Sequence, residues 1–182
     1  MGARMAGRIE VITGPMFSGK SEELLRRIYR VELANKPHIL FKPTIDKRYS
    51  QDEVVSHKGN RNGCRLIGEA EDMLVYPLAD VIGIDEAQFV EGDLLEVVEH
   101  LAGRGARVIV ACLDQDSLGK PFGKMGELMA VADEVTKLKA VCMKCGADAG
   151  RSQRLMSAGL QVSVGGMEQY EARCRECWLP VT

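Results

Sequence analysis

The sequence has almost no net charge, no long apolar run and no internal repeat. Its 24 Lys and Arg residues nearly balance its 26 Asp and Glu residues, which leaves a formal net charge of −2. Nucleic-acid-binding proteins usually carry a basic surface, so we expect no nucleic-acid partner and favour a small dissolved substrate. No apolar run could span a bilayer, and no cationic segment precedes an apolar one near the start. We therefore expect no membrane partner.

Strand and helix signals alternate through the first 140 residues. Apolar runs predict buried strands at 8–13, 38–42, 81–85 and 107–112, with a weaker signal at 134–138. Helical spacing of apolar residues occurs over 21–35, 68–77 and 91–103. Buried strands separated by helices predict an α/β fold, in which helices cover both faces of a parallel sheet.

The residues from Gly14 to Ser21 form a complete phosphate-binding loop. Their sequence, GPMFSGKS, fits the pattern G-x-x-x-x-G-K-[ST] and lies between a predicted strand and a predicted helix. We expect Lys20 to reach the β- and γ-phosphates and Ser21 to ligate Mg²⁺. The alternative, a glycine-rich turn that matches by chance, is disfavoured by the flanking strand and helix. The predicted ligands here are Gly14, Pro15, Met16, Phe17, Ser18, Gly19, Lys20 and Ser21.

Acidic residues follow the strand predicted at 81–85. Asp85 ends this apolar strand downstream of the P-loop, where P-loop proteins hold Mg²⁺ or its waters. Consecutive residues leaving a strand point to opposite sides, so Glu86 is free to act as a general base. For Asp85 the alternative is a carboxylate that caps the next helix, which the nearby P-loop disfavours.

A charged segment, Asp46, Lys47 and Arg48, follows the second predicted strand. Phosphoryl transfer needs positive charge near the transferred group, and an arginine fork matches phosphate oxygens well. On the pattern alone, a solvated charged loop is the favoured interpretation.

Four of the six cysteines form two C-x-x-C pairs. Cys142 and Cys145 are separated from Cys174 and Cys177 by 28 residues. Two such pairs predict a tetrahedral zinc site of the structural kind, with no open catalytic position. Reduced thiols fit a cytoplasmic location. We expect Cys112, within a buried strand, to be a core residue.

These signals divide the chain into three predicted segments. They are a flexible N-terminus at 1–7, a P-loop nucleotide-binding domain at 8–140 and a zinc-binding domain at 141–182. The last segment buries too little apolar area to fold alone, so zinc would supply the missing stabilisation. The long loop between its cysteine pairs is pinned at its base, which favours a functional role.

Several motifs occur in order along residues 8–178. They are Gly14–Ser21, Asp46-x-Arg48-Tyr49, Ser56-His57-x-Gly59, IDEAQF at 84–89, KPFG at 120–123, and the cysteine pairs with Gly165-Gly166 and Tyr170 between them. Together they resemble the type II, zinc-containing thymidine kinase family. The P-loop alone is shared by many nucleotide-binding proteins, whereas the ordered set is highly specific.

The resemblance implies a role for each matching residue. Glu86 matches the general base that deprotonates the 5′-hydroxyl of deoxythymidine, and Lys20 and Arg48 stabilise charge on the phosphoryl group. Beyond the P-loop, the ATP and Mg²⁺ site includes Asp46, Lys47, Arg48, Asp85 and Gln88. The implied substrate contacts are Met16, Phe89, Ser117, Phe122, Ser152, Gln161, Val162, Ser163, Val164, Gly165 and Tyr170. The segment 161–165 belongs to a zinc-anchored lasso that holds the thymine ring through main-chain groups.

The implied reaction converts ATP and deoxythymidine to ADP and deoxythymidine monophosphate (dTMP). Its implied cofactors are Mg²⁺ with ATP and a structural Zn²⁺. The resemblance also implies a cytoplasmic homotetramer inhibited by deoxythymidine triphosphate (dTTP).

Three positions depart from the family pattern. The family commonly has aromatic residues where this chain has Ser117 and Arg151, and often a basic residue at Leu118. Ser117 removes a stacking surface, which predicts deoxythymidine binding weaker by ~1 kcal/mol or more.

Two other classes of protein stay open. Asp85-Glu86-Ala87-Gln88 also resembles the DExx box of a P-loop ATPase or helicase-like fragment, although the chain is short and lacks a basic surface. A non-catalytic nucleotide-binding zinc protein is the other alternative, which the departures at Ser117 and Arg151 make conceivable.

Overall fold

The protein is built around a parallel sheet, as the sequence predicts. The structure, a computed structural model, describes residues 7–44, 53–55, 61–155 and 169–180. The sheet has six strands in the order β5-β2-β6-β7-β1-β8, all paired in parallel. These strands are β1 (Arg8–Thr13), β2 (His38–Pro43), β5 (Arg65–Ile67), β6 (Val81–Ile84), β7 (Arg107–Cys112) and β8 (Glu134–Lys137).

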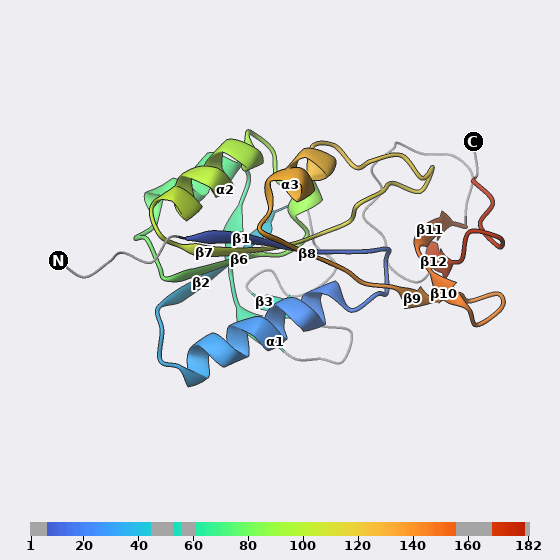
Figure 1. The fold of residues 1–182 in the computed structure, drawn as a ribbon, viewed down its shortest axis with the longest axis horizontal. Helices are drawn as coiled ribbons and strands as arrows, with labels where there is room; N and C mark the ends of the chain where they lie inside the picture. Colours follow the sequence, from blue (N-terminus) through green and yellow to red (C-terminus); the bar gives the residue numbers. More distant parts are fainter. Residues whose placement is uncertain (1–6, 45–52, 56–60, 156–168, 181–182) are drawn as a thin grey trace.

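Helices cover both faces of this sheet (Figure 1). Helix α1 (Lys20–Leu33) lies on one face, and α2 (Leu94–Gly103) and α3 (Met125–Val131) lie on the other. The two faces bury separate apolar clusters, one around Ile28 of α1 and one around Val98 of α2. The predicted α/β class is therefore confirmed.

Two helices differ from their predicted ranges for local reasons. The helix predicted at 68–77 is a shorter 3₁₀ helix, η1 (Ala70–Val75); Asp72 accepts the N–H groups of Gly68 and Glu69 at its start, and Pro77 follows its end. The helix predicted at 91–103 is α2, which begins only at Leu94 because Asp93 caps it by accepting the N–H of Glu96 (3.2 Å). A second 3₁₀ helix, η2 (Ala87–Phe89), follows β6.

Smaller strands lie outside the main sheet. β3 (Glu53–Val55) and β4 (Arg61–Gly63) form an antiparallel pair. Beyond β8 come β9 (Ala140–Val141), β10 (Asp148–Ala149), β11 (Arg151–Arg154) and β12 (Tyr170–Arg173). We call residues 140–155 and 169–180 the cysteine-rich unit; it lies beyond the carboxyl ends of the main strands (Figure 1). Its small core consists of Ala140, Cys142, Ala149, Ala172 and Cys174.

A buried carboxylate on β1 ties together neighbouring elements. Glu10 is 0% exposed, and its oxygens lie 2.6 Å from guanidinium nitrogens of Arg8, Arg27 and Arg107. Arg27 of α1 also contacts Glu134 of β8 (3.2 Å). Burial works to raise the pKa of Glu10, but hydrogen bonds from Arg107 and Arg27 outweigh it, so the pKa lies below its ordinary value.

We expect Glu10→Gln to reduce the free energy of unfolding by about 3 kcal/mol at pH 7, because it removes the buried negative charge on which the guanidinium groups of Arg8, Arg27 and Arg107 converge. The folded-state pKa of Glu10 is lowered, so its contribution is present above its ordinary pKa of 4.5 and is lost as the pH falls through the folded-state value. The difference in free energy of unfolding between wild type and Glu10→Gln, measured by urea unfolding, should therefore narrow below pH 4.5. Exposed Glu99 provides the control variant, Glu99→Gln. A difference in free energy of unfolding between wild type and Glu10→Gln that does not change with pH would contradict this account.

Candidate active site

The loop between β1 and α1 forms a tight turn that depends on two glycines. Gly14 (φ 146°) and Gly19 (φ 84°) adopt left-handed conformations that favour glycine. A Cβ on Gly14 would lie 2.5 Å from the carbonyl oxygen of Leu138. The Ser18 hydroxyl donates to the Pro15 carbonyl (2.8 Å), and α1 starts directly after Gly19. A curved glycine loop at a helix N-terminus suits an anion.

Lys20 is buried at the first position of α1. Its Nζ donates to the Pro15 carbonyl (2.8 Å). Burial lowers the pKa of Lys20, and the nearby carboxylates of Glu86 and Asp85 partly oppose that shift. The ammonium group therefore lies between the P-loop and the acidic residues that follow β6.

Asp85 and Ser21 lie side by side. The Ser21 hydroxyl donates to the Asp85 carboxylate, 2.9 Å from Oδ2 and 3.1 Å from Oδ1. Burial raises the pKa of Asp85 to about 7, and the charge of Glu86 adds to this effect. A hydroxyl and a buried carboxylate are oxygen ligands of the kind Mg²⁺ prefers, and a divalent cation would favour the ionised carboxylate. These residues fit Mg²⁺.

Glu86 is held in an uncommon backbone conformation. Its φ of 51° and ψ of 40° are left-handed, which few non-glycine residues adopt. Gln88 Nε2 donates to Glu86 Oε2 (2.5 Å), while Gln88 Oε1 accepts the N–H of Leu113 (3.0 Å). Gln88 thus fixes the Glu86 carboxylate to the chain just after β7. Phe17 of the P-loop is also left-handed (φ 64°), and such strain clusters at functional sites.

Several residues predicted to contact a nucleoside come from different elements. The rings of Phe89 and Phe122 meet edge to face, 5.8 Å apart at 89°. The Met16 N–H donates to the Ser152 hydroxyl (3.0 Å), which joins the P-loop to β11. Ser117 is half-buried in the β7–α3 loop (residues 113–124), and Tyr170 is buried at the start of β12.

Other predicted site residues lie outside the described part of the chain. They are Asp46, Lys47 and Arg48, and Gln161, Val162, Ser163, Val164 and Gly165. Five residues of the family motifs, Tyr49, Ser56, His57, Gly59 and Gly166, also lie outside the described part. Their roles stay predictions.

The four predicted zinc ligands converge. The sulfur atoms of Cys142, Cys145, Cys174 and Cys177 all lie within 4.8 Å of one another, and those of Cys145 and Cys174 are 3.7 Å apart. A tetrahedral zinc with bonds of about 2.3 Å separates its sulfurs by about 3.8 Å, so the cluster fits Zn²⁺. Cys112, in contrast, is a core residue, and burial raises the pKa of its thiol to about 12.

Two features of the site were not predicted. Asp114 is buried just after β7, 2.6 Å from Lys137 Nζ, and its charge acts on Lys20. The signal that identified Asp85, an acidic residue following a buried strand, could have found it. Phe17 packs against the core of the cysteine-rich unit, so the P-loop and that unit are in direct contact.

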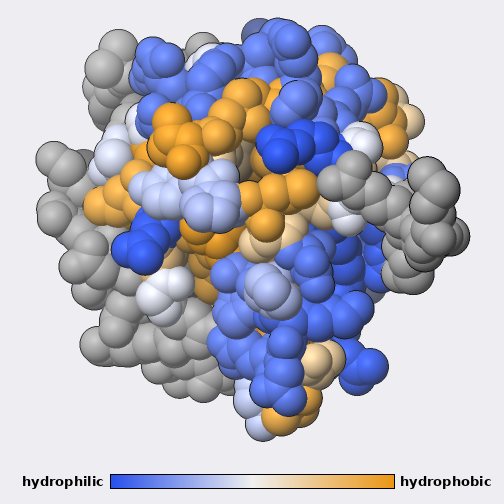
Figure 2. Space-filling view, turned by 90° about the vertical axis from the view of Figure 1, so that its left-hand side faces the viewer, coloured by the Kyte–Doolittle hydropathy of each residue, from blue (hydrophilic) through white to orange (hydrophobic). Residues whose placement is uncertain are grey.

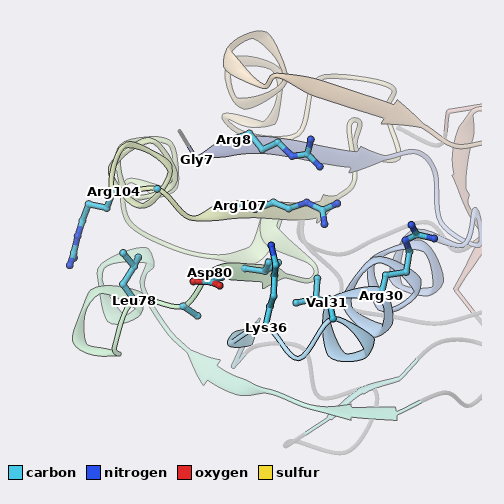
Figure 3. Close-up of a pocket in the computed structure, with 13 residues that line it drawn as sticks. Gly7, Arg8, Arg30, Val31, Lys36, Leu78, Asp80, Arg104 and Arg107 are labelled. Atoms are coloured by element: carbon cyan, nitrogen blue, oxygen red, sulfur yellow. The ribbon is translucent and has the colours of Figure 1, made fainter. Parts of the chain in front are cut away.

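A cleft of about 730 Å³ lies at the opposite, amino-terminal end of the strands. Figure 2 views this end, where hydrophobic surface runs between hydrophilic surface. In Figure 3, Arg8 and Arg107 extend side by side and Arg104 points away from them. The guanidinium groups of Arg8 and Arg107 already pair with Glu10, so the arginines do not converge on a ligand. The chemistry therefore belongs to the other end of the sheet.

In the described part of the chain, no helix combines the length and apolar character needed to cross a membrane.

Comparison with known proteins identifies the family of this chain. A family model described as thymidine kinase matches residues 7–178, a range that contains the P-loop, Glu86 and all four clustered cysteines. A curated thymidine kinase of Bacteroides thetaiotaomicron is 48% identical over 177 residues, which make up 97% of this chain and 89% of that protein. The chain belongs to the thymidine kinase family.

Proposed function

We propose that this chain transfers the γ-phosphate of ATP to the 5′-hydroxyl of deoxythymidine, giving ADP and dTMP. The observation that carries the proposal is the grouping of Lys20 and Ser21 with Asp85 and Glu86 beyond the carboxyl ends of β1 and β6. The chain that holds this group is a member of the thymidine kinase family. This grouping pairs a phosphate-binding loop with an acceptor of protons, which is what a kinase site requires.

The donor half of the site takes the triphosphate of ATP. Backbone N–H groups of Gly14–Ser21 and the α1 N-terminus surround the phosphates, and Lys20 neutralises charge on them. Ser21 and Asp85 would hold Mg²⁺, which when bound neutralises charge on the phosphates. Asp46, Lys47 and Arg48 complete this half, with Arg48 beside the transferred group. We include Gln88 here for its hold on Glu86.

Glu86 acts on the acceptor. Its carboxylate takes the proton of the 5′-hydroxyl as that oxygen forms a bond to the γ-phosphorus, while the bond from phosphorus to the β,γ-bridging oxygen breaks and ADP leaves. Gln88 supports this role because its amide bridges the Glu86 carboxylate and the backbone N–H of Leu113. Holding the base in place lowers the entropy cost of reaching the reactive arrangement.

The acceptor half encloses the nucleoside. We assign the substrate contacts to two groups of residues, one in the α/β part and one in the cysteine-rich part. They are Met16, Phe89, Ser117 and Phe122, and then Ser152, Gln161, Val162, Ser163, Val164, Gly165 and Tyr170. A loop that closes over the nucleoside would exclude water and limit hydrolysis of ATP.

The remaining features of the proposal come from the sequence patterns and from the family resemblance. We include the division at residues 1–7, 8–140 and 141–182, a structural Zn²⁺, a cytoplasmic homotetramer and inhibition by dTTP. The cysteine cluster supports the zinc.

The test of this function is whether ATP turnover depends on the nucleoside. ADP release should require deoxythymidine and should not change when DNA is added. ADP release that DNA stimulates, or that proceeds equally without deoxythymidine, would overturn the proposal in favour of an ATPase.

A further inference from the structure

Three consecutive side chains of β11 attach to three different segments. Arg151 reaches the β7–α3 loop, Ser152 accepts the N–H of Met16 in the P-loop, and Gln153 bonds the backbone of Leu179 through both ends of its amide. One short strand therefore joins the cysteine-rich unit to two loops of the candidate active site.

Arg151 makes the most extensive of these attachments. Its Nη1 donates to Gln115 Oε1 and also lies 3.4 Å from the Gly119 carbonyl. Its guanidinium lies over the ring of Trp178, 5.0 Å from the centroid, which is a cation–π arrangement. The Arg151 side chain is thus fixed between the loop and Trp178.

The loop leaves room for this contact only because of Gly119. Its φ is 75°, and a Cβ there would lie 2.8 Å from Arg151 Nη1 and 2.9 Å from the Trp178 ring. The loop is therefore shaped to pack against the Arg151–Trp178 pair.

Within the loop, the segment that carries Ser117 is stiffened by Asp116. Its Oδ1 accepts the N–H groups of Leu118 and Lys120, both at 2.9 Å. The contacts of Arg151 with Gln115 and Gly119 lie on either side of Ser117, so together they set the position of Ser117.

The start of the loop is linked to the candidate base. Leu113 begins the loop, and its N–H is held by Gln88, which also holds Glu86. The loop is consequently anchored at its start beside Glu86, and at Gln115 and Gly119 on the cysteine-rich unit through Arg151.

We propose that Arg151 is a positioning residue that fastens the β7–α3 loop to the cysteine-rich unit, so that the two parts form one wall of the nucleoside site. This inference rests on the proposed function. Arg151 acts through the loop and need not touch the nucleoside.

Arg151→Met tests the proposal, because it keeps a long side chain and removes both the hydrogen bonds and the cation–π contact. We expect the KM for deoxythymidine to rise about 10-fold, with KM for ATP and kcat changed less than about 2-fold. Arg151→Lys keeps the charge but not the fork, and should give an intermediate KM. Arg104→Met, a surface arginine at the far end of the sheet, is the matched control.

Trp178 supplies an independent readout, since it is the single tryptophan of the chain. Its emission spectrum should change in Arg151→Met at unchanged zinc content, and not in Arg104→Met. A rise in both KM values together, or a fall in kcat with an unchanged deoxythymidine KM, would overturn the positioning role.

A second variant covers the case in which Arg151→Met does not fold. Gln115→Leu removes the loop's acceptor and leaves Arg151 over Trp178, and by itself it should raise the deoxythymidine KM. If Arg151→Met does fold, adding it to Gln115→Leu should bring little further rise. Unchanged KM in Gln115→Leu, or additive effects in the double variant, would contradict the proposal. If ATP turnover by the wild-type protein did not depend on deoxythymidine, that result would instead contradict the proposed function.

Discussion

Glu86→Gln should lower kcat for deoxythymidine phosphorylation by about 10²- to 10⁴-fold, while ATP binding stays close to wild type. Glutamine has nearly the same shape, and its amide oxygen can still accept from Gln88 Nε2. It cannot take a proton from the 5′-hydroxyl. Steady-state ADP release gives kcat, and calorimetric titration with a non-hydrolysable ATP analogue gives the affinity.

The two measurements separate a chemical role from a structural one. A structural role would lower ATP affinity or the melting temperature along with kcat, because Glu86 sits beside Lys20 and Asp85. A kcat within about 10-fold of wild type would contradict the assignment of Glu86 as the base.

Cys145→Ser should release the zinc and abolish nucleoside phosphorylation. The cysteine-rich unit has a core of alanine and cysteine side chains, so little apolar burial holds it together. In small zinc sites the binding free energy, on the order of 10 kcal/mol, is also folding free energy. Loss of the unit would remove Ser152 from Met16 and Arg151 from the β7–α3 loop.

Zinc per chain, measured by elemental analysis, should fall from one to near zero. Far-ultraviolet circular dichroism should keep most of its signal, because the parallel sheet has its own core. Cys64→Ser is the matched control, as Cys64 packs against the α1 face of that sheet and not in the cluster. Full zinc content and full activity in Cys145→Ser would contradict the four-cysteine site.

Local patterns were sufficient to predict the frame of the fold. The strands predicted at 8–13 and 107–112 match β1 and β7 residue for residue, since β-branched residues make up at least half of each segment. The P-loop was also predictable, because its two glycines meet a local backbone requirement. The cysteine pairs are defined by spacing alone, and their sulfurs do converge.

Features that depend on short elements or distant contacts were not predictable. β5 has three residues and α3 has seven, too few for periodicity to be measured. Arg151 and Gln115 are 36 residues apart, and Glu10 and Arg107 are 97 apart. An arginine in place of an aromatic residue looked like a lost contact in the sequence, whereas in the structure it contacts both the loop and Trp178.

The most direct test of the two-substrate site is to count both products of one reaction. The protein is incubated with ATP, Mg²⁺ and deoxythymidine, and ADP and dTMP are quantified by chromatography, with ³¹P NMR locating the new phosphate. We expect one dTMP for each ADP, with the phosphate on the 5′-oxygen, and neither product when the nucleoside lacks its 5′-hydroxyl. ADP without matching dTMP would contradict the account.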